Sequence, residues 1–154
     1  MSSRNEARLR RFIREMVNGG GMHLMTEMVA PDYVGHEPHG DHYGPEGLRI
    51  VVAEYCVAFP DLSVTVEDLI AHGDKVVYRF RVHGTQTGPF LGIPPTRQLV
   101  SAGGIAIGHL AAGKLAESWV YLDALNLVRQ LTAAPSLERR SERPRSQAEN
   151  GHDR

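Results

Sequence analysis

Residues 98–123, QLVSAGGIAIGHLAAGKLAESWVYLD, predict a long antiparallel β-hairpin that forms one wall of the fold. Strands are expected at 98–110 and 114–123, and the loop between them, Ala111-Ala112-Gly113, has glycine where a three-residue hairpin loop needs a left-handed backbone. With Leu110 opposite Lys114, Ala106 faces Ser118 and Gly104 faces Val120. Alternation then puts small, nearly apolar residues on a single face of the hairpin: Gly104, Ala106, Gly108, Ser118, Val120 and Leu122.

The residues before this hairpin predict two more strands. Apolar side chains alternate with polar ones at 62–66 and again at 76–83, and His72-Gly73-Asp74 supplies the turn between them. Residues 88–95 are expected to form a loop that carries the apolar pair Phe90-Leu91.

The first third of the chain has helical periodicity instead. Residues 5–18 predict an amphipathic helix ended by three glycines, a short second helix runs to Pro31, and Gly44-Pro45-Glu46 opens a third. Residues 30–44 are expected to form a polar loop, and Ala124 to Leu131 a final turn or short helix.

Helices followed by a run of antiparallel strands indicate an α+β fold with the helices on one face of the sheet. A curved, mostly antiparallel sheet closed by three N-terminal helices makes a conical barrel around a hydrophobic cavity. This cone domain is expected to span residues 1–132. Residues 133–154 have almost nothing to bury and predict a disordered polar tail.

The composition excludes several classes of partner. The chain of 154 residues is long enough for one domain with a hydrophobic core. Its net charge of −1 creates no field that would attract nucleic acid or an anionic membrane. No apolar run approaches the roughly 20 residues of a membrane span, and no signal peptide is recognisable, so a cytoplasmic protein is expected.

Several motifs resemble the SnoaL-like polyketide cyclases, which belong to the nuclear transport factor two-like superfamily. They include Phe59-Pro60-Asp61-Leu62 and, in the helical half, Gly44-Pro45-Glu46-Gly47-Leu48. The most specific is Phe90-Leu91-Gly92-Ile93-Pro94-Pro95-Thr96, followed by the hairpin residues Gly113-Lys114-Leu115. The resemblance covers residues 5–132.

This resemblance implies a conical α+β barrel, a homodimer formed through the outer face of the sheet, and a small hydrophobic polyketide-like substrate. The prototype members close the last ring of an aromatic polyketide by intramolecular aldol condensation, without a metal or a cofactor. Their catalytic aspartate corresponds to Val120 here, and the histidine and glutamine that assist it correspond to Ala106 and Gly104. All three groups are therefore absent.

The loss of these groups leads to the hypothesis that the cavity acts by its shape. Valine cannot transfer a proton, a step worth about 10²–10⁴-fold to an aldol enzyme. A concerted ring closure such as a cycloaddition needs mainly a folded substrate, and proximity supplies at most about 7–11 kcal/mol. The predicted function is a cofactor-independent cyclase, of lyase or isomerase type, in the biosynthesis of an antibiotic or related natural product.

Two alternatives stay open. An acid/base aldol-type cyclase would use His36, in the loop at the expected cavity mouth, or Asp123, at the end of the last strand. Asp123 is also a natural N-cap for the segment that follows it. A non-catalytic protein would instead shelter a hydrophobic metabolite.

The expected substrate-binding residues combine aromatic side chains with the small face of the hairpin: Tyr33, Tyr55, Phe59, Phe90, Gly104, Ala106, Val120 and Leu122. Five polar residues upstream are of types that bind metals: His36, Glu37, His39, Asp41 and His42. Their spacing matches no defined zinc or iron motif, so no metal is expected.

Overall fold

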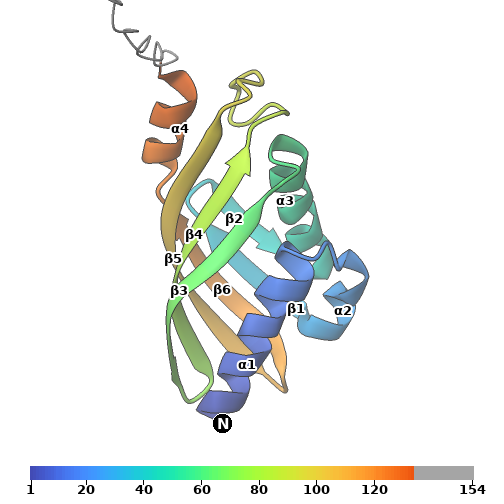
Figure 1. Cartoon of the computed structure of the whole chain (residues 1–154). Helices are drawn as coiled ribbons and strands as arrows, with labels where there is room; N and C mark the ends of the chain where they lie inside the picture. Colours follow the sequence, from blue (N-terminus) through green and yellow to red (C-terminus); the bar gives the residue numbers. More distant parts are fainter. Residues whose placement is uncertain (134–154) are drawn as a thin grey trace, which may run out of the picture.

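One curved sheet of six strands carries the fold in the computed structural model, which describes residues 1–133 (Figure 1). The strand order is β2-β1-β6-β5-β4-β3, and the sheet does not close, since β2 and β3 are its edges. All neighbours pair antiparallel except β1 and β6, which are parallel. The strands are β1 (Val29–Glu37), β2 (Gly40–Tyr43), β3 (Ser63–His72), β4 (Lys75–Thr85), β5 (Leu99–Ala111) and β6 (Lys114–Leu122). The predicted α+β class and the mostly antiparallel sheet are confirmed.

Three N-terminal helical segments lie on one side of this sheet, as predicted (Figure 1). The helices are α1 (Ser2–Phe12), continued by a π-helical segment at Ile13–Val17; α2 (Met25–Met28), preceded by a 3₁₀ turn; and α3 (Gly44–Ala58). Helix α1 packs against β3 and β4, and α3 packs against β1. Helix α4 (Ala124–Thr132) packs on β5 near the other end of the molecule. None of the helices described here combines the length and the apolar character needed to cross a membrane. Apart from Ala133, the predicted polar tail lies outside the described residues.

The polar loop predicted at residues 30–44 is wrong, because most of it forms β1 and β2. Tyr33 and Gly35 of β1 are buried, while His36 points to the opposite face, where its ring stacks on Trp119. Polar residues, a proline and a glycine interrupt the apolar alternation that identifies a strand. The strand forms because it pairs with β6, with Gly35 opposite Ser118.

The turn between β5 and β6 is shorter than predicted. It contains two residues, Ala112 and Gly113, which both have positive φ angles (49° and 81°), as two-residue hairpin turns require. Next to it the register shifts, so that Ala106 lies opposite Val120 and not opposite Ser118. The predicted pairing was therefore wrong by two residues. A shift of two preserves the alternation, so the predicted face keeps its members.

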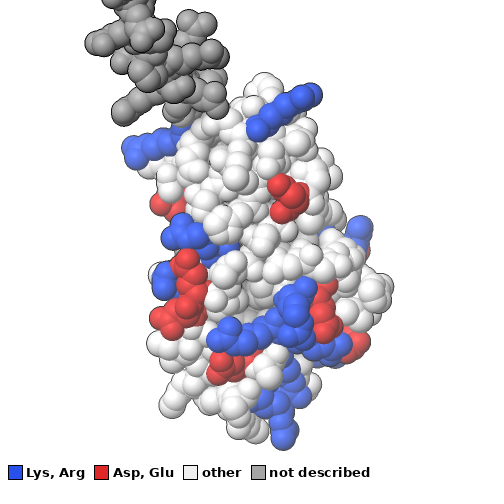
Figure 2. Space-filling model, viewed as in Figure 1, with Lys and Arg blue, Asp and Glu red and all other residues white. Residues whose placement is uncertain are grey.

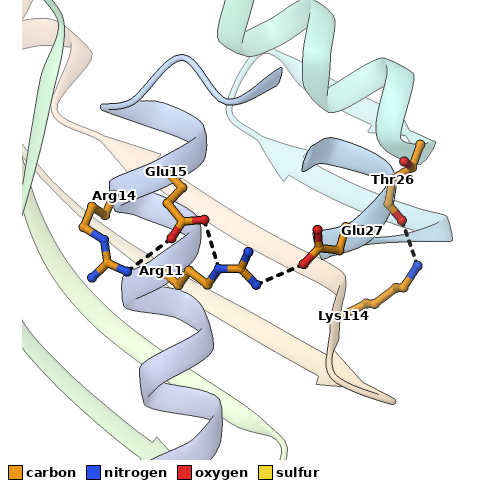
Figure 3. Close-up of polar contacts among 6 residues, drawn as sticks. All are labelled: Arg11, Arg14, Glu15, Thr26, Glu27 and Lys114. Carbon is orange, nitrogen blue, oxygen red and sulfur yellow. Dashed lines mark hydrogen bonds and ion pairs between the residues drawn. The ribbon is translucent and has the colours of Figure 1, made fainter. Parts of the chain in front are cut away.

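Polar contacts join α1, α2 and the β5–β6 turn (Figure 3). Arg11 contacts Glu15 of its own helical segment at 2.9 Å and Glu27 of α2 at 3.0 Å. Lys114 Nζ donates a hydrogen bond to the carbonyl oxygen of Thr26 at 2.8 Å. Charged side chains of both signs gather over α1, while the surface above them is largely uncharged (Figure 2). Such exposed pairs contribute little to stability, so the buried apolar contacts beneath α1 hold it in place.

Candidate functional site

The inner face of the sheet and the helices that cover it line a partly open cavity of about 170 Å³. Its lining is predominantly apolar. Five of the predicted substrate-binding residues line it: Tyr55, Phe59, Phe90, Val120 and Leu122. These residues meet between α3, the 88–95 loop and the end of β6, and their role in substrate binding stays a prediction.

Three aromatic rings form one wall of this cavity. The ring of Phe90 lies 5.1 Å from that of Phe59, nearly edge-on, and 5.6 Å from that of Tyr55. Burial, with Glu37 and Glu54 nearby, raises the pKa of Tyr55 to about 12, so its hydroxyl stays protonated at neutral pH. Offset and edge-to-face contacts of this kind hold aromatic rings in fixed orientations.

A fully buried glutamine fixes the loop that carries Phe90. Gln86 Nε2 donates a hydrogen bond to the carbonyl oxygen of Ile93 at 3.0 Å. Its Oε1 accepts from the backbone N–H of Thr96 at 3.1 Å and from the Thr96 hydroxyl at 2.8 Å. Because the side chain bridges both ends of the loop, it holds Phe90 and Leu91 against the cavity.

Gly104 and Ala106, predicted on the cavity wall, are not among the described residues that line it. A Cβ atom added to Gly104 would lie 2.3 Å from Cζ of Phe80, the residue opposite it on β4. Ala106 lies opposite Tyr78 and is buried in the core. Large aromatic side chains of β4 therefore fill the space above the small residues of β5, which corrects their predicted place.

Tyr33 is also in the core and not on the cavity lining. Its hydroxyl lies 2.7 Å from Ser118 Oγ and 3.4 Å from His42 Nε2. Burial raises the pKa of Tyr33 to about 12, against the opposing effect of the hydrogen bond with Ser118. Burial lowers the pKa of His42, which favours its neutral form. These groups form a buried polar cluster between β1, β2 and β6.

His36 lies on the outer face of the sheet. Its Nε2 is 2.9 Å from Glu117 Oε1, its Nδ1 is 3.0 Å from Asp41 Oδ1, and its ring stacks on Trp119 with centroids 5.3 Å apart. The hydrogen bonds to Glu117 and Asp41 raise the pKa of His36. This histidine joins β1, β2 and β6 on the side opposite the cavity.

Asp123 is exposed and caps α4. Its Oδ1 accepts a hydrogen bond from the backbone N–H of Asn126 at 3.1 Å, the geometry of an N-cap. Neither Asp123 nor His36 is among the described residues that line the cavity. Their catalytic roles stay predictions, and their positions outside the cavity lining do not favour a catalytic role for either residue.

A carboxylate that the sequence reasoning did not place in the cavity enters it from β1. Glu37 lines the cavity, and its side chain is only 9% exposed. Burial raises the pKa of Glu37, an effect that His39 partly offsets from 3.3 Å away. The sequence could have placed Glu37 on the inner face through its alternation with Tyr33 and Gly35. This alternation becomes visible once residues 29–37 are recognised as a strand.

The polar residues of β1 and β2 do not converge as metal ligands. His36 points to the outer face, Glu37 to the cavity, and His42 to the buried cluster around Tyr33. Within residues 1–133, no group of three or more His, Cys, Asp or Glu side chains is arranged to hold a metal ion.

Comparisons with known proteins identify relatives of this fold. Residues 7–131 match the family model described as SnoaL-like polyketide cyclase. A proposed SnoaL-like polyketide cyclase from Jannaschia sp. CCS1 is 28% identical, with a TM-score of 0.81, covering 87% of this chain and 95% of that one. TsrD from Streptomyces laurentii is 32% identical, with a TM-score of 0.76 and coverages of 86% and 97%. IdmH from Streptomyces antibioticus, a proposed polyketide cyclase, is 27% identical, with a TM-score of 0.75 and coverages of 84% and 99%. No curated protein matches the sequence.

Proposed function

Because the chain belongs to the family of SnoaL-like polyketide cyclases, we propose that it closes a ring in a hydrophobic, polyketide-like intermediate held in the cavity. The observation that carries this proposal is the cavity itself, with apolar walls from α3, β4 and β6 and one nearly buried carboxylate, Glu37. Apolar walls select a hydrophobic chain, and the few polar groups among them, Glu37, His39, His83 and the Tyr55 hydroxyl, can orient it.

The dimensions of the cavity fit one ring of such an intermediate. An apolar cavity of about 150 Å³ holds benzene, and this one is about 170 Å³. Holding the two reacting ends of a flexible chain together supplies up to about 7–11 kcal/mol of the barrier. Like the prototype aldol reaction of the family, this ring closure needs no cofactor. We therefore place the reaction among the cyclisations of natural-product biosynthesis.

Two model substrates test the proposal. Heptane-2,6-dione closes to a six-membered ring by an intramolecular aldol reaction, and 1,7,9-decatrien-3-one closes by an intramolecular cycloaddition. We expect the protein to accelerate at least one of them above the rate in buffer, measured by gas chromatography of the cyclic product. Acceleration of the diketone alone indicates proton transfer, and acceleration of the triene alone indicates catalysis by shape. If neither reaction is accelerated, the chain is not a general ring-closing catalyst and the proposal fails.

The second candidate function is a non-catalytic carrier of a hydrophobic metabolite. The aromatic wall of Tyr55, Phe59 and Phe90 favours it, because stacked rings bind flat apolar molecules whether or not a reaction follows. Binding of both model substrates without formation of any cyclic product would select this function.

We also propose that two copies of the chain pair through the outer face of the sheet. Large apolar side chains stand exposed on this face of β3 to β6, and the strand register places them side by side: Ile70, Val77, Ile105, Ile107 and Tyr121. A contiguous exposed apolar surface of this kind marks an interaction site. A two-fold symmetric pair buries the same patch on both copies, so one surface suffices.

The variant Ile105→Lys tests this pairing. A lysine on each copy, near the middle of the patch, would oppose its symmetric partner or leave a charge buried. We expect the parent chain to elute with the mass of a dimer in size-exclusion chromatography with light scattering, and the variant with the mass of a monomer. A parent chain that is monomeric at high concentration contradicts the proposal.

A further inference from the structure

Glu37 of β1 lies beside Val120, the position that the resemblance aligns with the catalytic aspartate of the aldol cyclases. In the parallel pair of β1 and β6, Gly35 lies opposite Ser118 and His36 opposite Trp119. Continued by one residue, this register would bring Glu37 to the level of Val120, and both side chains line the cavity. The resemblance to the aldol cyclases aligns Val120 with their catalytic aspartate, and Glu37 is an acidic group on the neighbouring strand of the same wall.

We propose that Glu37 is the catalytic acid/base of this cavity, in the role of the aspartate that the resemblance aligns with Val120. The inference deepens the proposed function, on which its role in ring closure rests. It identifies the substrate as a compound with an acidic C–H beside one carbonyl group and a second carbonyl group within reach.

The surroundings of Glu37 suit this task. Its side chain is 9% exposed, and the walls around it are apolar, so water competes little for the carboxylate oxygens. Desolvation raises the pKa of Glu37 above the ordinary value for glutamate, so its carboxylate is a stronger base than one in water. His39 Nε2, 3.3 Å from Oε2, orients the carboxylate from the β1–β2 turn.

The ionisable groups near Glu37 come from three elements besides that turn. Glu54 and Tyr55 belong to α3, Tyr33 to β1 itself and Tyr78 to β4. Burial raises the pKa of all three tyrosines, so they stay neutral across the pH range in which Glu37 titrates. Glu54 acts against ionisation of Glu37 and His39 in favour of it.

The proposed step balances without any co-reactant. The ionised Glu37 takes a proton from the carbon beside one carbonyl group, which leaves an enolate and a neutral carboxyl group. The enolate carbon attacks the second carbonyl carbon, so a C–C bond forms while the C=O π bond opens to an alkoxide. Glu37 then returns its proton to that oxygen, and the enzyme regains its starting state.

The first half of this step can be tested with 2-tetralone, a neutral bicyclic ketone, one ring of which matches the volume of the cavity. In D₂O a base inside the cavity exchanges the hydrogens beside the carbonyl group for deuterium, which proton NMR measures directly. We expect the parent chain to exchange 2-tetralone faster than the same concentration of acetate does. We expect Glu37→Gln to lower the protein-dependent rate by about 10²–10⁴-fold. The parent rate should also rise with pH through a pKa above the usual value for glutamate, a dependence that Glu37→Gln should lose.

Glu117→Gln is the matched control, since it removes a glutamate from β6 whose side chain contacts His36 on the outer face. We expect its rate to stay within about twofold of the parent rate. Because glutamine avoids the cost of an ionised buried group, Glu37→Gln should unfold at or above the parent melting temperature at pH 7. Thermal unfolding therefore distinguishes a variant that has lost the catalytic base from one that has lost its fold.

Three results would overturn the proposal: no exchange by the parent chain above acetate, an unchanged rate in Glu37→Gln, or an equal loss in Glu117→Gln. The proposed function is tested separately, by the cyclic products formed from the two model substrates. If the parent chain and Glu37→Gln cyclise the triene equally well, the proposed function is supported and the assignment of Glu37 as the base is rejected. If the parent chain exchanges the hydrogens of 2-tetralone, Glu37→Gln does not, and the parent cyclises neither model substrate, Glu37 is supported as a base and the proposed ring-closing function is rejected.

Discussion

Val120→Trp is expected to remove most of the affinity of the cavity for an apolar molecule while the chain stays folded. Val120 lines the cavity from β6, and the indole would extend into space that the parent leaves empty. Each 100 Å² of apolar probe surface kept in water costs about 2.5 kcal/mol, which is about 70-fold in Kd. Prodan, a neutral naphthyl ketone whose emission shifts to the blue in apolar surroundings, measures the affinity directly.

Leu99→Trp controls for the added ring. Leu99 is an exposed residue at the start of β5, and it is not among the described residues that line the cavity. We expect this variant to bind prodan with the parent Kd. Circular dichroism of both variants checks the fold, because filling an empty space strains the structure less than overpacking a dense core. Undiminished binding by a folded Val120→Trp would mean that prodan binds elsewhere and that the cavity is not the binding site.

Part of the cavity lining could be predicted from the sequence because its residues lie in segments with clear local patterns. The inner face of β6, the aromatic end of α3 and the apolar loop around Phe90 all carry strong local signals, and five predicted residues indeed meet there. The error at Gly104 had a different cause. The inward face of β4 was evident, but the register between β4 and β5 was not, and this register places Phe80 over Gly104.

The prediction of His36, and not Glu37, as a catalytic candidate shows that the assignment of site residues depends on recognising β1 as a strand. Treated as a loop, residues 30–44 gave no indication of which polar side chains point into the cavity, and His36 was selected because histidine is the natural proton carrier near neutral pH. In a strand, successive side chains point to opposite faces, so His36 reaches the outer face and Glu37 the cavity. The strand itself depends on pairing with β6, which lies about 80 residues later in the chain, and local patterns do not show such partners.

Placing a carboxylate on β6 is expected to restore activity to a chain that has lost Glu37. The double variant Glu37→Gln/Val120→Asp keeps one acidic group in the cavity wall and places it on β6, at the position that the resemblance aligns with the catalytic aspartate of the aldol cyclases. Aspartate is close to valine in size, so the wall keeps its shape. We expect the double variant to exchange the hydrogens of 2-tetralone at least about tenfold faster than Glu37→Gln alone, part of the 10²–10⁴-fold that a positioned base contributes.

The single variant Val120→Asp provides the matching control. It places two carboxyl groups on neighbouring strands in an apolar wall, where like charges resist joint ionisation and raise the pKa of the pair. We therefore expect no gain in exchange rate at neutral pH and a rate profile displaced to higher pH. A double variant as inactive as Glu37→Gln, with its fold and prodan binding intact, would show that the two positions are not equivalent. The site would then depend on features that only β1 supplies, of which the contact between Glu37 and His39 is the first to examine.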